Sequence, residues 1–457
     1  MKKGLLSILL IIIFIGSALY IIIKNKQMSY TDNNTLSTKV SKNKGESKYL
    51  SMFNEIVSIM HTDYSGFKDK SGWDNPEKYR NQILRLEDSN SMTDKLFKDI
   101  VDDYLLDFKD SHIFLNFNNP TEYKISGFTT RRYEDKLYIT DITQEYRLQK
   151  GMAILELDGI SINELSYKYK RELKTEDTDR QEWSSIIRNS KSAKVQDREG
   201  NIFNFDLKLY NANSVNITPC KISLINEETA VITLDTFYYT DYINQTLEDN
   251  KDILDNCRNL IIDVRKNDGG SDSSFQKLLE YIFKGEVDIN TFSINYDIEY
   301  NLTDRNYELL VDSFKNESQI LTNNKGKGFV TLYPKANKEP IKFLGKDKPE
   351  KVIILSDKYC GSSGDSFVEI AKESDKVIVV GRPTAGVTDY SNLVSYSLND
   401  TFTFKYPTTR SKRIDVGMEL EGKGVQVDIH IPWTPEHIDT DIDMIEAKKI
   451  LNLDELK

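Results

Sequence analysis

The residues "KVIILSDKYCGSSGDSFVEIAKESDKVIVVG", 351–381, predict a strand, a loop, a helix and a second strand. The apolar runs at 351–356 and 376–381 have the length and β-branched composition of buried strands. Two such strands joined by a helix predict a right-handed crossover and parallel pairing. Open α/β sheets bind ligands at the carboxyl ends of their strands, so the loop 357–363 is a candidate functional loop.

Ser362 has two interpretations in this loop. It can cap the following helix together with Asp365, three residues later, and the loop alone favours this reading. It can also be a nucleophile, because the free N–H groups at a helix start stabilise an oxyanion. Cys360 precedes the helix and is typical of a small buried apolar residue rather than a nucleophile.

Outside this unit, strands continue to alternate with helices. The strand "NLIIDVR" ends in "KNDGG", and a helix follows it. This alternation predicts an α/β core with a mainly parallel sheet over 213–457, with an insertion at 286–345. The paired glycines let the backbone approach a ligand. If the two loops are neighbours, an N–H of Gly269 or Gly270 can form an oxyanion hole with that of Ser363.

The upstream half has a different pattern. Apolar residues recur at helical spacing from residue 48, and a strand begins at His112, so 48–120 is predicted as a helical region leading into that strand. Residues 121–212 are mostly β. Taken alone, His112 is typical of a structural histidine, and Glu421 is typical of an exposed carboxylate in a turn.

Read in order, the motifs "DSH", "LIIDVRKNDGG", "CGSSGDSF", "VVGRPTAG" and "ELEGKGVQVDIHI" form a recognisable set. They resemble the serine peptidases that include the C-terminal processing (tail-specific) peptidases and the tricorn core protease. The resemblance covers about residues 50 to 455. It implies a peptidase core of the ClpP/crotonase type.

The resemblance also implies roles for individual residues. Ser362 matches the nucleophile. Val387 stands where many tail-specific members have a lysine base, so this dyad is absent. Ser111, His112 and Glu421 match the Ser/His/Ser/Glu branch instead, with His112 as base and the other two residues orienting and tuning it. A histidine can accept the proton of a hydroxyl at neutral pH, whereas a valine cannot.

The resemblance further implies that 121–212 is a PDZ-like domain. Such domains bind extended peptides, often through a terminal carboxylate held by backbone N–H groups. "SGF" at 126–128 is the candidate loop, which makes Gly127 and Phe128 candidate substrate-binding residues. A purely structural β-domain is the alternative.

The N-terminal sequence predicts where in the cell the protein is located. Gly4 to Ile23 is an uncharged apolar run of about the length that spans a bilayer, flanked by lysines. Its length and its bulky end favour a retained transmembrane anchor at 1–24 over a cleaved signal peptide. A polar linker follows at 25–47. The lysine pair before the run favours a cytoplasmic N-terminus and an extracytoplasmic catalytic domain.

Composition limits the classes of partner and cofactor that this protein could use. The formal net charge is −11 and no long basic run lies beyond the N-terminus, which argues against a nucleic-acid partner. The three cysteines and four histidines are scattered, so we expect neither a metal nor a cofactor. The sequence predicts a membrane-anchored serine endopeptidase acting on peptides or unfolded proteins. A catalytically silent peptide-binding relative is the alternative, and an esterase is disfavoured because GxSxG is missing.

Overall fold

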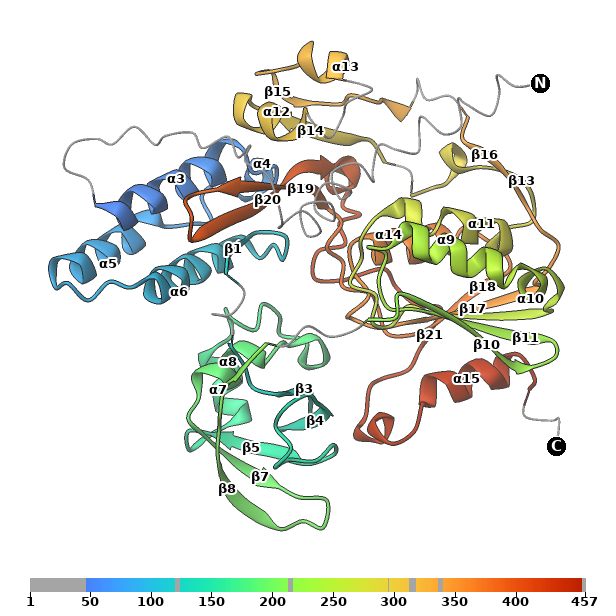
Figure 1. Cartoon of the computed structure of the whole chain (residues 1–457), viewed down its shortest axis with the longest axis horizontal. Coiled ribbons are helices and arrows are strands. Elements are labelled where there is room, and N and C mark those ends of the chain that lie inside the picture. The colour runs from blue at the N-terminus through green and yellow to red at the C-terminus, as the bar shows by residue number, and fades with distance from the viewer. Residues whose placement is uncertain are drawn as a thin grey trace.

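The computed structural model describes residues 47–119, 124–212, 217–294, 296–311, 318–335 and 340–453. The predicted anchor at 1–24 and nearly all of the linker at 25–47 lie outside these ranges. Among the helices in the described ranges, none combines the length and apolar character needed to cross a membrane. The chain forms three units, whose helices and strands are labelled in Figure 1.

Helices from the N-terminal region form the first unit. They are α3 (Lys48–Thr62), α4 (Phe67–Lys70), α5 (Pro76–Asp88) and α6 (Asp94–Leu105). Ser47 caps α3 by accepting the N–H of Leu50. The buried face of α3 includes Phe53, Ile56 and Met60, as the helical spacing predicts. These helices pack on a five-stranded antiparallel sheet. Four of its strands follow the order β1 (Phe114–Phe117), β20 (Phe402–Ser411), β14 (Ile298–Leu302), β15 (Gly328–Val330). The fifth strand, β19 (Tyr390–Ser397), also pairs with β20.

This first sheet joins distant parts of the chain. The insertion predicted at 286–345 contributes β14 and β15, and residues 390–411 near the C-terminus contribute β19 and β20. The strand predicted to begin at His112 begins at Phe114 instead, and His112 lies in the turn before it. This strand, β1, pairs with β20. The histidine is thereby positioned by the first unit, although most of the predicted site belongs to the catalytic core.

The core unit is built on a six-stranded sheet. Its order is β10 (Cys220–Asn226), β11 (Thr229–Leu234), β12 (Asn259–Asp263), β17 (Lys351–Ser356), β18 (Val377–Gly381), β21 (Ile429–His430). Every pairing is parallel except β10 with β11. The predicted parallel character holds for this sheet only, because the pairings of the other sheets in the described ranges are antiparallel.

Helices cover both faces of the core sheet (Figure 1). On one face lie α9 (Thr240–Asp249), α11 (Gln276–Ile282) and α14 (Ser363–Ala371), and on the other lies α15 (Ile442–Ile450). Side chains alternate along each strand. On β17, for example, Ile354 faces α14 and Ile353 faces α15. Burial on both faces explains the continuous apolar runs of these strands.

A separate β-domain forms the third unit. Its sheet runs β3 (Phe128–Tyr133), β4 (Lys136–Ile142), β5 (Ala153–Leu157), β7 (Ser192–Gln196), β8 (Ile202–Asp206), with β6 (Ile160–Ser161) beside β5 and the helices α7 (Ile162–Lys168) and α8 (Ser184–Asn189). It has its own apolar core around Ile139, Ile154 and Trp183. The PDZ-like assignment of this domain stays a prediction.

The remaining α-helices and strands in the described ranges connect or extend these units. They are β2 (Lys124–Ile125), β9 (Tyr210–Asn211), α10 (Lys251–Asn256), β13 (Gly285–Asp288), α12 (Asp304–Leu310), α13 (Ser318–Thr322) and β16 (Lys342–Gly345). Buried ion pairs fasten the β-domain to the core. Arg131 on β3 makes two hydrogen bonds to Asp357, directly after β17, and Arg382 binds the same carboxylate. The β-domain is thus anchored next to the loop that carries Ser362.

Candidate active site

Ser362 stands at the turn between β17 and α14 in a strained backbone conformation. Its φ of 57° and ψ of −121° lie outside the regions that non-glycine residues normally occupy. Such strain persists only where the surroundings enforce it, and it concentrates at functional sites. The Ser362 N–H donates to Asp365 Oδ2 at 2.9 Å, so the carboxylate of Asp365 stabilises the start of the helix.

The glycine loop after β12 packs directly against Ser362. Strands β12 and β17 are parallel neighbours, so their carboxyl ends meet, and Gly361 N–H donates to the Asn267 carbonyl at 2.9 Å. A Cβ added at Gly269 would lie 2.6 Å from Ser362 Cβ, and the φ of this glycine is +95°. Only glycine fits at this position.

The structure distinguishes Gly269 from Gly270 as a possible oxyanion donor. The Gly269 N–H donates to Asn267 Oδ1 at 3.0 Å and is therefore occupied. The N–H groups of Gly270 and Ser363 donate to no residue in the described ranges. The Ser363 hydroxyl donates to the Gly270 carbonyl at 3.0 Å, which holds the two residues together.

Asp365 connects Ser362 to the loop 385–387. Its carboxylate accepts the N–H of Gly386 at 2.8 Å and that of Val387 at 2.9 Å, in addition to that of Ser362. Burial raises the pKa of Asp365, and these hydrogen bonds oppose the rise. Val387, at the position of the missing lysine, therefore lies beside the candidate nucleophile.

His112 is held from both its backbone and its ring. Its N–H donates to Asp110 Oδ1 at 2.8 Å, and Asp110 Oδ2 accepts the Tyr64 hydroxyl at 2.8 Å. Its Nδ1 lies 2.7 Å from the Tyr390 carbonyl oxygen. A carbonyl can only accept, so Nδ1 carries the proton and Nε2 presents its lone pair.

One short segment links Ser362 with His112. Val387 shares the Asp365 carboxylate with Ser362, and Tyr390 receives the His112 ring. Val387 and Tyr390 are three residues apart, a distance of at most about 11 Å between their Cα atoms. Ser362 and His112 form no hydrogen bond with each other, and such contacts are often looser before a substrate binds.

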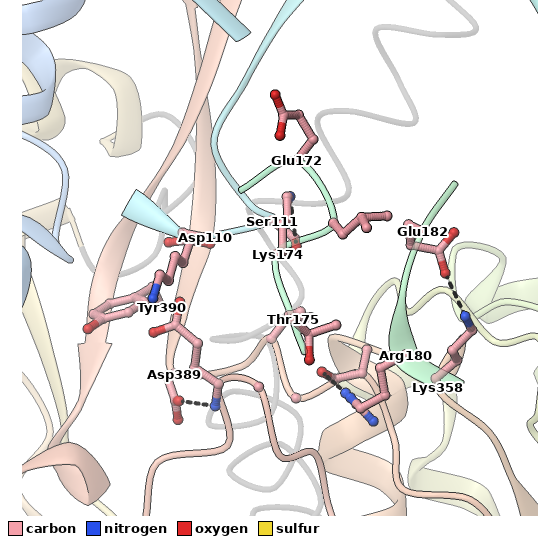
Figure 2. A pocket seen from close by; sticks show the side chains of 17 residues that line it. Asp110, Ser111, Glu172, Lys174, Thr175, Arg180, Glu182, Lys358, Asp389 and Tyr390 are labelled. Carbon is pink, nitrogen blue, oxygen red and sulfur yellow. Dashed lines mark hydrogen bonds and ion pairs between the residues drawn. The ribbon is translucent and has the colours of Figure 1, made fainter. Parts of the chain in front are cut away.

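A pocket of about 490 Å³ opens beside this segment (Figure 2). One wall comes from 109–111, 385–390 and 421–422, and the other from 172–182 of the β-domain together with Lys358. Lys358 is paired with Glu182 at 3.0 Å, and Arg180 donates to the carbonyls of Thr384 and Ala385. Burial lowers the pKa of Lys358, and Glu182 opposes this effect.

Ser111 and Glu421 line the pocket, but neither bonds to His112. The exposed Ser111 hydroxyl is 3.5 Å from Lys174 Nζ. Glu421 Oε1 instead lies 2.7 Å from Lys70 Nζ. Burial raises the pKa of Glu421, whereas the Lys70 ammonium opposes the rise.

The candidate peptide-binding loop is occupied by contacts within its own domain. The Gly127 carbonyl accepts the N–H groups of 143, 144 and 145, and the Phe128 side chain is buried in the β-domain core. The Ser126 hydroxyl donates to the Phe128 carbonyl. Substrate binding by Gly127 and Phe128 stays a prediction.

Sequence reasoning did not select Asp110, Tyr390 or Lys70. Asp110 belongs to the "DSH" motif, so its position beside His112 could have been predicted from the sequence. Tyr390 acts through a backbone carbonyl, which leaves no residue-type signal. Lys70 belongs to a helix far from every motif. Within the described ranges, no group of three or more His, Cys, Asp or Glu residues is placed to hold a metal ion.

Comparison with known proteins gives a family and a fold. Residues 228–431 match the family model of peptidase family S41. The structure of mature CPAF complexed with lactacystin aligns with a TM-score of 0.61 and 13% identity, covering 89% of this chain and 99% of that chain. The crystal structure of mature CPAF aligns with a TM-score of 0.59 and 14% identity, covering 88% and 96%. The photosystem II D1 C-terminal processing protease aligns with a TM-score of 0.43 and 14% identity, covering 86% and 94%. At these identities the CPAF likeness establishes a shared fold.

Proposed function

Because this chain belongs to peptidase family S41, and is therefore a serine peptidase, we propose that Ser362 is its nucleophile and His112 its general base. The strained backbone of Ser362 at the carboxyl end of β17 carries this proposal. The packing of Gly269 against Ser362 supports it, because the chain keeps this close approach where only glycine fits.

In the proposed mechanism, Ser362 Oγ attacks the carbonyl carbon of the scissile peptide bond. His112 Nε2 accepts the hydroxyl proton and returns it to the leaving amine, which leaves an acyl-enzyme. Water, deprotonated by the same nitrogen, then hydrolyses the ester. The Tyr390 carbonyl, by accepting the Nδ1 proton, orients the ring and stabilises the imidazolium that forms.

The N–H groups of Gly270 and Ser363 are the proposed oxyanion donors. Both are free of partners in the described ranges, and the Ser363 hydroxyl keeps the two residues together. One oxyanion donor typically contributes about 10²–10³ in rate. Ser111 and Glu421 are proposed to assist from the pocket, where they influence the charge around His112 rather than bond to it.

The proposed location follows from the N-terminal sequence. A retained membrane anchor at Gly4–Ile23 would place an endopeptidase outside the cytoplasm. Membrane fractionation of the full chain and of a variant lacking residues 1–24, followed by protease treatment of intact cells, tests this. Recovery of the full chain in the soluble fraction would contradict the anchor.

A fluorophosphonate probe tests the nucleophile. We expect an adduct on Ser362, loss of labelling in Ser362→Ala, and retention in Ser366→Ala, a control one turn further along α14. Labelling of Ser362→Ala at another serine would move the nucleophile. A folded wild-type protein that takes up no label would instead favour the catalytically silent peptide-binding relative.

A further inference from the structure

Lys70 carries a fully buried ammonium group next to the proposed catalytic centre. The residue is 1% exposed and ends the short helix α4. Its Nζ donates to Glu421 Oε1 at 2.7 Å and to the Phe108 carbonyl at 2.8 Å. It also lies 4.5 Å from the centre of the Tyr390 ring. A buried charge is tolerated only when it is paired in this way.

Each of these three partners belongs to a segment that leads to the proposed base. Phe108 precedes the turn that carries Asp110 and His112. Tyr390 provides the carbonyl that receives the His112 ring. The Glu421 N–H donates to Asp389 Oδ2 at 2.8 Å, and Asp389 directly precedes Tyr390. Through these contacts, one ammonium group joins three segments that are distant in sequence.

The residue before Lys70 strengthens this arrangement. Asp69 accepts the Tyr390 hydroxyl at 3.0 Å and two hydrogen bonds from Arg410. Tyr390 is therefore held at its ring by Lys70, at its hydroxyl by Asp69 and at its carbonyl by His112. Helix α4 thus fixes the residue that orients the imidazole.

We propose that Lys70 is a positioning residue of the proposed catalytic centre, which neutralises Glu421 and, through Phe108 and Tyr390, holds His112 in its reactive orientation. This inference rests on the proposed function. In this inference Glu421 is the counter-charge of the buried Lys70 ammonium. The pair Lys70–Glu421 has no net charge.

Removing one partner unbalances the pair. In Glu421→Gln the Lys70 ammonium stays buried beside the Tyr390 ring without this counter-charge. A nearby cation disfavours the imidazolium, so the midpoint of the pH–rate profile of kcat/KM is expected to fall, by about 0.5–1 pH unit. In the double variant Lys70→Met/Glu421→Gln both charges are gone, and the midpoint is expected to return to the wild-type value.

The other groups around His112 stay the same in all of these variants, so they cancel in the comparison. Asp110 and Tyr390 contact His112, Tyr64 contacts Asp110, and Glu172, Lys174 and Asp389 line the neighbouring pocket. Lys70→Met alone is expected to lower kcat by about 10- to 100-fold with a small change in KM, because the orientation of the base is lost while the substrate surface remains.

Lys68→Met is the matched control. Lys68 is on the same helix, but its ammonium pairs with Glu299 at the surface, away from the pocket. Circular dichroism spectra and melting curves establish that each variant folds. If Lys70→Met alone is unfolded, the comparison of Glu421→Gln with the double variant still tests the charge pairing, since the double variant leaves no buried charge unpaired.

Two outcomes would overturn the inference. In one, the double variant keeps the shifted midpoint of Glu421→Gln. In the other, folded Lys70→Met retains kcat within twofold of wild type. Failure of the proposed function has a different signature, because His112→Ala would then keep normal turnover whatever the Lys70 variants do.

Discussion

His112 Nδ1 lies 2.7 Å from the carbonyl oxygen of Tyr390, a residue 278 positions later in the chain. The contact commits the Nδ1 proton to a backbone acceptor and leaves Nε2 free to accept a proton. The acceptor is a main-chain atom, so substitution of the Tyr390 side chain cannot remove it directly. Helix α4, which holds the ring and hydroxyl of Tyr390, is the route by which the contact can be perturbed.

His112→Ala is expected to lower kcat/KM by about 10² to 10⁴, the usual contribution of a positioned general base. Steady-state cleavage of a fluorogenic peptide that the wild type hydrolyses measures this loss. His430→Ala is the control, because His430 is exposed at the edge of the core sheet. Near-normal turnover of His112→Ala would assign the base to another residue, with Lys174 and Lys358 of the pocket as the next residues to replace.

Gly269→Ala is expected to lower kcat by at least about 10²-fold, because its Cβ would collide with Ser362 Cβ. Gly285→Ala is the matched control. Gly285 also has a positive φ, of +70°, but an added Cβ would meet nothing within 4 Å. Both substitutions force alanine into the left-handed region, at about 1–2 kcal/mol. Similar kcat values in the two variants would contradict the expected effect of the collision at Ser362.

Asp272→Asn is expected to stabilise the protein at alkaline pH relative to acid pH. Burial raises the pKa of Asp272 from 3.8 to about 6, and the nearby Ser363 hydroxyl opposes this rise. The folded state therefore binds the proton more tightly than the unfolded state. The contribution of Asp272 to stability is therefore largest below about pH 4 and is lost as the pH rises through 6.

Asparagine cannot ionise, so the difference in melting temperature between Asp272→Asn and wild type should be a few degrees more favourable at pH 8 than at pH 4. Differential scanning calorimetry at both pH values measures it. Asp135→Asn, in the exposed turn between β3 and β4, should give the same difference at both. A pH-independent difference for Asp272→Asn would contradict the expected titration.

Arg131→Met is expected to destabilise the chain and to loosen the β-domain from the core. The substitution removes both hydrogen bonds from Arg131 to Asp357 and leaves this buried carboxylate with Arg382 and the Lys358 N–H. Breaking one partner of a buried pair typically reduces stability by about 3–5 kcal/mol. Arg147→Met, which removes an ion pair within the β-domain, is the control.

Thermal unfolding and limited proteolysis of 124–212 report the two effects of Arg131→Met. We expect a lower melting temperature and faster cleavage at the edges of the β-domain than in Arg147→Met. Equal proteolysis of the two variants would mean that other contacts, such as those of Arg180 with the loop 383–385, hold the domain in place.

The peptidase family and the catalytic core could be predicted from the sequence because their signals are local. The strand, loop and helix around Ser362 occur within about thirty residues, and β17 begins and ends where its apolar run does. Two apolar strands joined by a helix can pair in parallel in few ways. The meeting of the Gly269 loop with the Ser362 loop follows from that pairing, and the structure confirms it.

The surroundings of His112 depend on contacts between distant segments. Lys70 and Glu421 are 351 positions apart, and no periodicity relates them. The insertion and the tail join the N-terminal helices in one antiparallel sheet, which local patterns do not specify, because a strand's partner depends on the whole topology. The choice between Gly269 and Gly270 required the position of a single amide, that of Asn267, which accepts one N–H and leaves the other free. The sequence therefore supplied the chemical groups, and the packing of three units around one pocket supplied their orientation.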